Sequence, residues 1–305
     1  MGVIAIIAAL FLEQWRPLGD RKAVALTLSG WADWLERSFD AGESRHGAIA
    51  WLIAVLAPVA TVLAAYAALV WLNPLAGLLL NVAALYLTLG FRQFSHFFTD
   101  IQGAIREGDV DRARELIGTW RSESALHRSR EEVIRLAIEE AVAASHRNVF
   151  AVLFWFVLLP GPSGAILYRL AAFLQRRWGG KGEFGRFARR ALYLMEWPTA
   201  RLTAASFAMV GDFEDAIYCW STQAAAWPDP NVGIVLAAGA GALGVRLGMP
   251  LSETEGLQAR SDLGLGEAAD APLLDSTVGL LWRALVLWVV VLIVGLMVIM
   301  LARMF

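Results

Sequence analysis

Two long apolar stretches without a charged residue constrain most strongly what this chain can fold into. Residues 49–72 and 284–302 are each uncharged. Each is close to the length of about 20 residues that a helix needs to cross a bilayer, whose hydrocarbon core is about 30 Å thick. Trp51 and Trp71 lie at the two ends of the first stretch, a position typical of interfacial aromatic residues. Both stretches are predicted to span the membrane.

The composition fits a membrane protein with a sizeable polar part. Apolar residues make up 58% of the chain and charged residues 18%, against roughly 45–50% and 25% in soluble domains. The net charge of −2 gives no basic surface for nucleic acid, which is therefore not expected as a partner. Cys219 is the single cysteine, so neither a disulfide within the chain nor a cysteine-ligated metal is expected.

Two further apolar segments accompany these spans. Residues 75–91 follow the turn signal Asn73-Pro74 and are expected to return through the bilayer as an antiparallel helix, completing a hairpin. Residues 2–12 are too short for a full span and lack the basic region of a secretory signal. We expect a helix that is partly inserted or packed on protein.

A fifth apolar segment, residues 149–173, is interrupted by Pro160-Gly161-Pro162. Basic residues follow it, and the positive-inside rule places such a cluster on the cytoplasmic side. The charge pattern favours a broken, re-entrant pair of half-helices that leaves the cluster inside. The alternative is one tilted span with the cluster outside.

The predicted fold class is all-α: a polytopic membrane helical bundle with helical cytoplasmic segments and a broken re-entrant helix pair, because no stretch alternates with a period of two for long. Localisation in the cytoplasmic (inner) membrane with several passes is expected. The expected parts are an N-terminal partly inserted helix and linker (1–48), a transmembrane hairpin (49–91), a cytoplasmic helical segment (92–148), the broken segment (149–174), a basic and Gly/Ala-rich helical region (175–277) and a C-terminal transmembrane helix (278–305).

Several polar motifs resemble helix starts. Gly108-Asp109 precedes a charged helix, and Ser129-x-x-Glu132 has the form of a capping box. The acids Asp212, Glu214 and Asp215 are interpreted as a helix start in preference to a Mg²⁺ site. The small residues of 237–244 permit a close approach of either another helix or a ligand, and both alternatives stay open. The scattered histidines show no ligand spacing, so no metal site is assigned.

From about residue 85 to 248 the chain resembles the CobD/CbiB family of cobalamin-biosynthesis membrane proteins and their relative AmpE, a membrane protein associated with β-lactamase induction. The resemblance rests on short motifs that occur in the family's order. They are Gly108-Asp109-x-x-x-Ala113-Arg114, Leu153-Phe154-Trp155, Gly161-Pro162 with Tyr168-Arg169, Trp197 with Ala200-Arg201-Leu202-Thr203, Pro230-Asn231-x-Gly233 and Ala240-Gly241-Ala242-Leu243-Gly244.

The chain departs from the family where its enzymes carry acids. Glu139 is kept as the first acid of one motif, whereas Ala143, Ala144, Arg147 and Asn148 stand at the motif's later positions. Other acidic and amide positions have become Ala172, Gln175, Leu192 and Tyr193. Hydrophobic side chains supply no oxygen to Mg²⁺. The leading hypothesis is therefore an AmpE-like signalling or binding protein without assigned catalytic residues.

The resemblance also implies an alternative, a ligase of the adenosylcobinamide-phosphate synthase type. Such an enzyme joins adenosylcobyric acid to aminopropanol phosphate as an amide, using ATP and Mg²⁺. Glu139 would then hold metal or amine, Arg169 and Arg201 phosphate, and Asn231 with Gly233 the corrinoid or nucleotide; Tyr168 is the remaining candidate ligand-binding residue.

A second alternative is a membrane subunit that docks a partner protein through residues 92–147. Apart from the lipid bilayer, the expected partners are a corrinoid or cell-wall-derived small molecule and further copies of the chain. No cofactor is assigned unless the ligase alternative holds.

Overall fold

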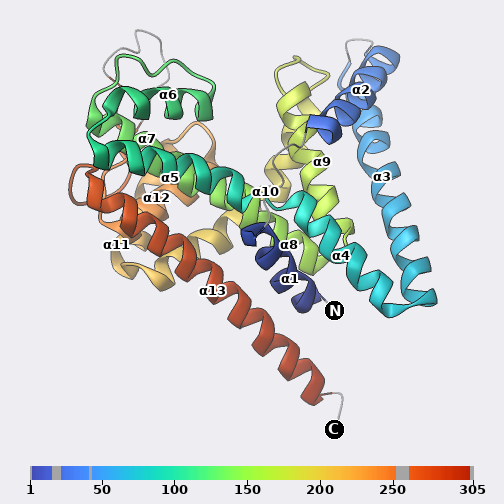
Figure 1. The fold of residues 1–305 in the computed structure, drawn as a ribbon. Helices are drawn as coiled ribbons and strands as arrows, with labels where there is room; N and C mark the ends of the chain where they lie inside the picture. The colour runs from blue at the N-terminus through green and yellow to red at the C-terminus, as the bar shows by residue number, and fades with distance from the viewer. Residues whose placement is uncertain (1, 16–21, 41–42, 252–260, 303–305) are drawn as a thin grey trace. The chain divides into compact units, whose positions relative to one another are not determined.

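The computed structural model describes residues 2–15, 22–40, 43–251 and 261–302, which fall into two compact units (Figure 1). Unit 1 comprises Met1–Gly90 and Ala151–Pro198, and unit 2 comprises Phe91–Phe150 and Thr199–Phe305. Regular structure in the described residues is helical, apart from two isolated bridges that join Val245 to Glu267 and Leu247 to Leu263. The predicted all-α fold is confirmed.

Unit 1 is built around a helical hairpin. Helices α3 (Ser44–Leu72) and α4 (Pro74–Thr88) pack together on either side of Asn73, whose side chain accepts a hydrogen bond of 2.9 Å from the Leu75 amide. Helix α1 (Gly2–Trp15) packs on α4, and α2 (Lys22–Phe39) packs on α3. Pro58 lies inside α3 without ending the helix.

The break expected in residues 149–173 is present in unit 1. Helix α8 (Ala151–Leu158) ends before the Pro-Gly-Pro motif, α9 (Ser163–Trp178) begins after it, and the two pack against each other. Gly161 has a φ of +63°, and a Cβ there would lie 2.5 Å from the ring of Tyr66. The backbone conformation and this close contact both explain why glycine occupies the turn.

The basic cluster at the C-terminal end of α9 and in the residues after it pairs with acids of α2. The Arg177 guanidinium donates to Asp33 with an Nε–Oδ1 distance of 2.8 Å, and Lys181 pairs with Glu36. This hydrogen bond lowers the pKa of Asp33. The next helix, α10 (Arg186–Val210), belongs to unit 1 up to Pro198 and to unit 2 from Thr199.

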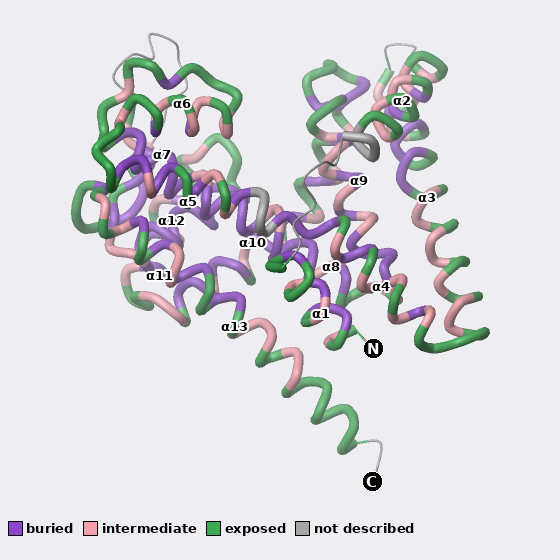
Figure 2. The backbone as a smooth tube through the Cα atoms, viewed as in Figure 1, coloured by how far each residue is buried: buried purple, intermediate pink, exposed green. Residues whose placement is uncertain are grey.

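Unit 2 is organised around α7 (Arg130–Ser145), most of whose residues are buried. Helices α5, α6, α12 and α13 all pack against α7, and α11 packs against α12. Figure 2 shows α12 buried along its length and the far half of α13 exposed. The bounds are α5 Phe91–Glu107, α6 Val110–Arg121, α11 Phe213–Gln223, α12 Pro230–Leu243 and α13 Ala271–Ala302, with a 3₁₀ turn, η2, at Ala224–Ala226.

The predicted helix starts are confirmed in unit 2. Ser129 and Glu132 form a reciprocal capping box at the start of α7, with distances of 2.8 and 3.1 Å. Asp109 caps α6 by accepting from the Arg112 amide, and Asp212 caps α11 by accepting from the Asp215 amide, each at 3.0 Å. These acids therefore satisfy amides that a helix start leaves unpaired.

The small residues of α12 serve close helix packing. A Cβ on Gly241 would lie 2.4 Å from the carbonyl oxygen of Asp215 in α11, and one on Gly239 would lie 2.9 Å from Val142 in α7. Contacts this short exclude a side chain. Of the two alternatives left open by the sequence, the approach of another helix is the one observed at both glycines.

The boundary expected between residues 148 and 149 lies inside a helical run that begins with α7. A π-helical turn, η1 (His146–Phe150), joins α7 to α8, so a continuous helical run extends from Arg130 to Leu158. The division between the two units falls within this run. His146 is anchored in unit 2, with its Nδ1 3.0 Å from the Thr203 hydroxyl.

Three helical runs of the described chain are long and apolar enough to cross a membrane: Ser44–Leu72, Arg130–Leu158 and Ala271–Ala302. The most apolar windows of the first and last are only 22% and 11% buried within the protein, against 67% for the middle one. Exposed apolar helices of this length are stable against lipid. Together with the composition, these helices make the chain a membrane protein.

Helix α4 differs from its prediction in length. It ends at Thr88 instead of residue 91, and its 15 residues correspond to about 22 Å. That length falls short of the hydrocarbon core of about 30 Å. The predicted return of residues 75–91 through the bilayer is therefore not supported by the length of the helix alone.

Candidate functional site

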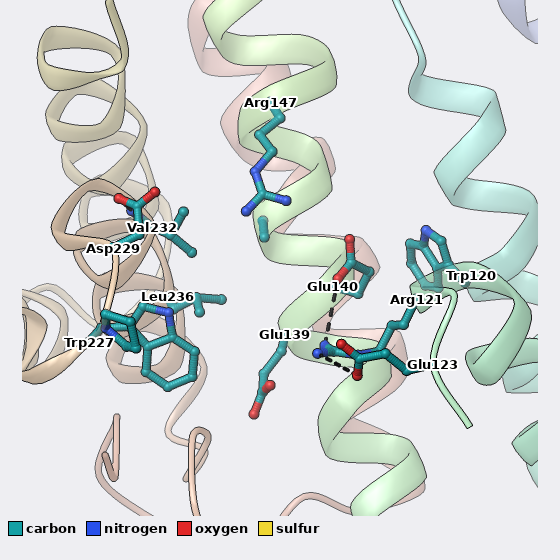
Figure 3. Close-up of a pocket in the computed structure, with 12 residues that line it drawn as sticks. Trp120, Arg121, Glu123, Glu139, Glu140, Arg147, Trp227, Asp229, Val232 and Leu236 are labelled. Atoms are coloured by element: carbon teal, nitrogen blue, oxygen red, sulfur yellow. Dashed lines mark hydrogen bonds and ion pairs between the residues drawn. The ribbon is translucent and has the colours of Figure 1, made fainter. Parts of the chain in front are cut away.

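A pocket with charged walls lies within unit 2, among the C-terminal end of α6, the C-terminal half of α7 with the turn η1, and the start of α12 (Figure 3). Its volume is about 420 Å³, in the range of small-molecule sites. Its walls combine four carboxylates, two guanidiniums and two indoles. The lining residues are Trp120, Arg121, Glu123, Glu139, Glu140, Ala143, Arg147, Trp227, Pro228, Asp229, Val232 and Leu236.

One wall of the pocket is a network centred on Arg121 at the end of α6. Its guanidinium lies 3.7 Å from the carboxylate of Glu140 on α7 and 3.4 Å from that of Glu123. Figure 3 shows both ion pairs on the same side of α7. Two carboxylates therefore compensate the charge of Arg121.

The opposite wall contains Glu139 and the start of α12. Glu139 is buried and points toward the side of Trp227 and Leu236 (Figure 3). Its Oε1 accepts a hydrogen bond of 2.8 Å from the amide of Gly248, in the turn after α12. Gly248 has a φ of +82°, so Glu139 also fixes a turn that requires glycine.

Asp229 is the N-cap of α12. Its Oδ1 accepts from the amides of Asn231 and Val232 at 3.0 and 3.3 Å. Asn231 is buried in the first turn, and a Cβ on Gly233 would lie 2.4 Å from the carbonyl oxygen of Ala224. Asn231 and Gly233 therefore lie beside the pocket residues Asp229 and Val232 but do not themselves line the cavity.

The remaining predicted residues lie elsewhere. Tyr168 and Arg169 belong to α9 in unit 1, where the Tyr168 hydroxyl donates to Glu196 at 3.0 Å and Arg169 Nε donates to the carbonyl of Thr88. Arg201 is half-buried on α10 within unit 2 and does not line the pocket. Of the six predicted binding residues, Glu139 alone lines this pocket.

Sequence reasoning missed Arg147 as a site residue. In the family motif Arg147 stands where the enzymes carry an acid, yet in the folded chain its side chain lines the pocket. Helical spacing offered the signal, because Glu139, Ala143 and Arg147 follow one another at intervals of four and therefore share a helix face. The contribution of α12 carried no such signal, since its pocket residues are about ninety positions away along the chain.

The pocket does not fit a resident magnesium ion. Among residues whose placement is described, no group of three His, Cys, Asp or Glu side chains could hold a metal ion. Each of the nearest carboxylates already has a donor: Glu140 pairs with Arg121, Glu139 accepts from Gly248, and Asp229 caps α12. The walls instead suit a small molecule that bears charged groups and an apolar or ring portion beside the indoles.

The model of the family described as CobD/Cbib protein matches residues 6–281. The chain is 35% identical over 300 residues to the cobalamin biosynthesis protein CobD of Stutzerimonas stutzeri, covering 96% of this chain and 97% of the relative. It is 37% identical over 239 residues to that of Chromobacterium violaceum, covering 76% of each chain. A third such protein, from Leptospira interrogans, is 27% identical over 181 residues, 56% of this chain and 57% of the relative.

No solved structure matches the chain. The family match covers most of the sequence, and the relative from Stutzerimonas stutzeri is matched over 97% of its length. The chain belongs to the CobD/CbiB family.

Proposed function

We propose that this protein is a cobalamin-biosynthesis ligase that joins adenosylcobyric acid to aminopropanol phosphate, forming an amide at the expense of ATP. The observation that carries the proposal is the relationship to a cobalamin biosynthesis protein CobD over 96% of this chain and 97% of the relative. The pocket of unit 2 supports it because its walls carry the charges that a phosphorylated amine requires.

Glu139 is proposed to face the amine of the aminopropanol unit. Its carboxylate is buried at the pocket wall and is oriented by the Gly248 amide, so it is held in place before any ligand binds. An ionised carboxylate attracts an ammonium group and can accept its proton as the amide forms. Arg169, Arg201, Asn231, Gly233 and Tyr168 remain proposed contacts to phosphate, corrinoid or nucleotide.

The leading hypothesis from the sequence, an AmpE-like signalling or binding protein, is less well supported. It rested on the loss of family acids at positions such as Ala143 and Arg147. The relatives reported above are named cobalamin biosynthesis proteins CobD, and two of them match at 35–37% identity. The named relatives therefore favour the ligase alternative over the AmpE-like hypothesis.

We further propose that the protein is a multi-pass protein of the cytoplasmic membrane. The exposed apolar surfaces of α3 and α13 support two crossings. The positive-inside rule places the basic residues at and after the end of α9 on the cytoplasmic side. The proposed ligase would bind its co-substrate ATP on that side.

Growth of a cobalamin auxotroph that lacks its own ligase tests the function. We expect the wild-type chain to restore growth on cobyric acid, and the purified protein to form adenosylcobinamide phosphate from adenosylcobyric acid, aminopropanol phosphate and ATP. Protein that is present in the membrane but neither restores growth nor forms the amide would refute the ligase proposal.

A variant of Glu139 refines this test. Glu139→Gln keeps an oxygen that can accept from the Gly248 amide but removes the negative charge. Loss of turnover with unchanged folding is expected if the charge serves the reaction. Full activity in Glu139→Gln would assign the carboxylate to the Gly248 turn alone.

A further inference from the structure

Arg147 is a cation whose side chain lines the pocket and has no partner among the described residues. It lies in the π-helical turn after α7, is half-buried, and makes no hydrogen bond or ion pair with another residue that the structure describes. Arginine stays protonated at any pH relevant to a protein. A partly buried charge without a partner is costly to maintain, so its presence beside a cavity points to a ligand of opposite charge.

The surroundings of Arg147 leave room for that ligand. Ala143 lies one turn before Arg147 on the same face of α7, and its methyl group fills little of the space between Arg147 and Glu139. Figure 3 shows the guanidinium on the pocket side of the helix, with Asp229 and Val232 across the opening. The second guanidinium of the pocket, that of Arg121, already has two carboxylate partners. Arg147 is therefore the cation available to an incoming anion.

The chemistry of the site favours a phosphate group. A guanidinium presents a planar fork of donors that matches two phosphate oxygens at once. The four carboxylates of the pocket walls disfavour a ligand with negative charge alone. A ligand that combines phosphate with an ammonium group meets both kinds of wall.

We propose that Arg147 binds the phosphate of the amino alcohol substrate and makes the pocket selective for the phosphorylated amino alcohol over the unphosphorylated one. This inference rests on the proposed function for the identity of the phosphate compound. The binding of a phosphate monoester at Arg147 is independent of that function. ATP carries the same phosphate chemistry with more negative charge and no ammonium, and it is expected to bind this pocket more weakly.

Binding of defined probes to the full-length protein in detergent tests the inference. Titration calorimetry would compare aminopropanol phosphate, unphosphorylated aminopropanol, inorganic phosphate and ATP. Loss of a charge-assisted hydrogen-bonded pair of this kind corresponds to about 10- to 100-fold in affinity. We expect Arg147→Gln to lower the affinity for aminopropanol phosphate by that factor and to leave the affinity for unphosphorylated aminopropanol unchanged.

Two further variants make the result specific. Arg147→Lys keeps the charge without the planar fork and is expected to retain part of the affinity. Arg112→Gln removes an exposed arginine of α6 outside the pocket and is expected to bind like wild type. Equal affinities of wild type and Arg147→Gln for aminopropanol phosphate would overturn the inference, as would a tighter complex with ATP that depends on Arg147.

The two proposals fail separately. Ligase activity whose preference for the phosphorylated amino alcohol is unchanged in Arg147→Gln would leave the proposed function standing and remove Arg147 from phosphate recognition. If phosphate probes bind in a way that depends on Arg147 but the protein forms no amide, the proposed function fails and the role of Arg147 in phosphate binding stands. Slow labelling of the buried Cys219 thiol in each variant confirms that unit 2 is folded.

Discussion

The close packing of α12 against α11 predicts that adding one methyl group at Gly241 destabilises the folded protein. In Gly241→Ala the new Cβ would lie 2.4 Å from the carbonyl oxygen of Asp215 and 2.8 Å from the Cα of Ala216. All three nearest atoms are backbone, so no side chain can move aside. Overpacking costs about 1–3 kcal/mol, and contacts this short belong at the upper end. Alanine regains about 1 kcal/mol of helix propensity, which leaves about 2 kcal/mol of destabilisation.

Cys219 supplies the assay. It is the only cysteine, lies on α11 and is fully buried, and burial raises the pKa of its thiol. A thiol reagent therefore labels it only when the packing around α11, which includes the contact with α12, opens. Where the protein opens and closes faster than the reagent reacts, the labelling rate of Cys219 is proportional to the fraction of molecules in which the thiol is accessible. A loss of about 2 kcal/mol corresponds to labelling about 30 times faster.

Gly103→Ala is the matched control. Gly103 also lies inside a helix of unit 2, α5, but nothing lies within 4 Å of a Cβ built there. The substitution is expected to gain helix propensity without a clash and to leave Cys219 labelling at the wild-type rate. If Gly241→Ala labels as slowly as Gly103→Ala, the close contact does not hold these helices together and the reasoning is wrong.

Three further changes test other parts of the fold. Ser129→Ala removes the capping box of α7 and is expected to cost about 1 kcal/mol, seen as faster amide exchange in its first turn; wild-type exchange would contradict a stabilising cap. The hydrogen bond from Arg177 lowers the pKa of Asp33, so the ionised carboxylate stabilises the fold above the unfolded pKa of about 3.9, and this stabilisation is lost as the pH falls through the lower folded pKa. Amide protection of α2 is therefore expected to decline in acid. Asp33→Asn is expected to abolish the part of that decline that depends on Asp33. Gly161→Ala places a methyl group against the Tyr66 ring at a φ of +63° and is expected to lower the thermal stability of unit 1, whereas Gly180→Ala, with open space around it, should not.

Local signals in the sequence predicted much of the helical structure. The capping box at Ser129 and the N-caps Asp109 and Asp212 depend on contacts within a few residues, so their spacing alone identifies them. The apolar stretches that became α3 and α13 were equally clear, because lipid imposes its requirement on every residue of a span.

The pocket was harder to predict because its walls come from distant parts of the chain. Glu139 was identified through the family motif, but its bond to Gly248 joins positions 109 residues apart. The role of Arg147 depends on residues that are distant in sequence. The family motif shows only that an acid has been replaced, whereas the fold shows that the new cation lies beside a cavity. The π-helical turn that carries it also left no pattern in the apolar periodicity.

The two halves of α13 differ in how strictly their packing limits which residues they can contain. Its buried residues, Leu274 to Leu285, all lie in the first half, where Asp275 also pairs with Arg106 of α5. Beyond Leu285 the helix exposes most of its apolar side chains. One inserted residue turns everything after it by about 100°, which a surface facing lipid on most sides tolerates and a packed one does not. The first half of α13 is therefore an integral part of unit 2, whereas most of the second half is exchangeable for other apolar sequence of equal length.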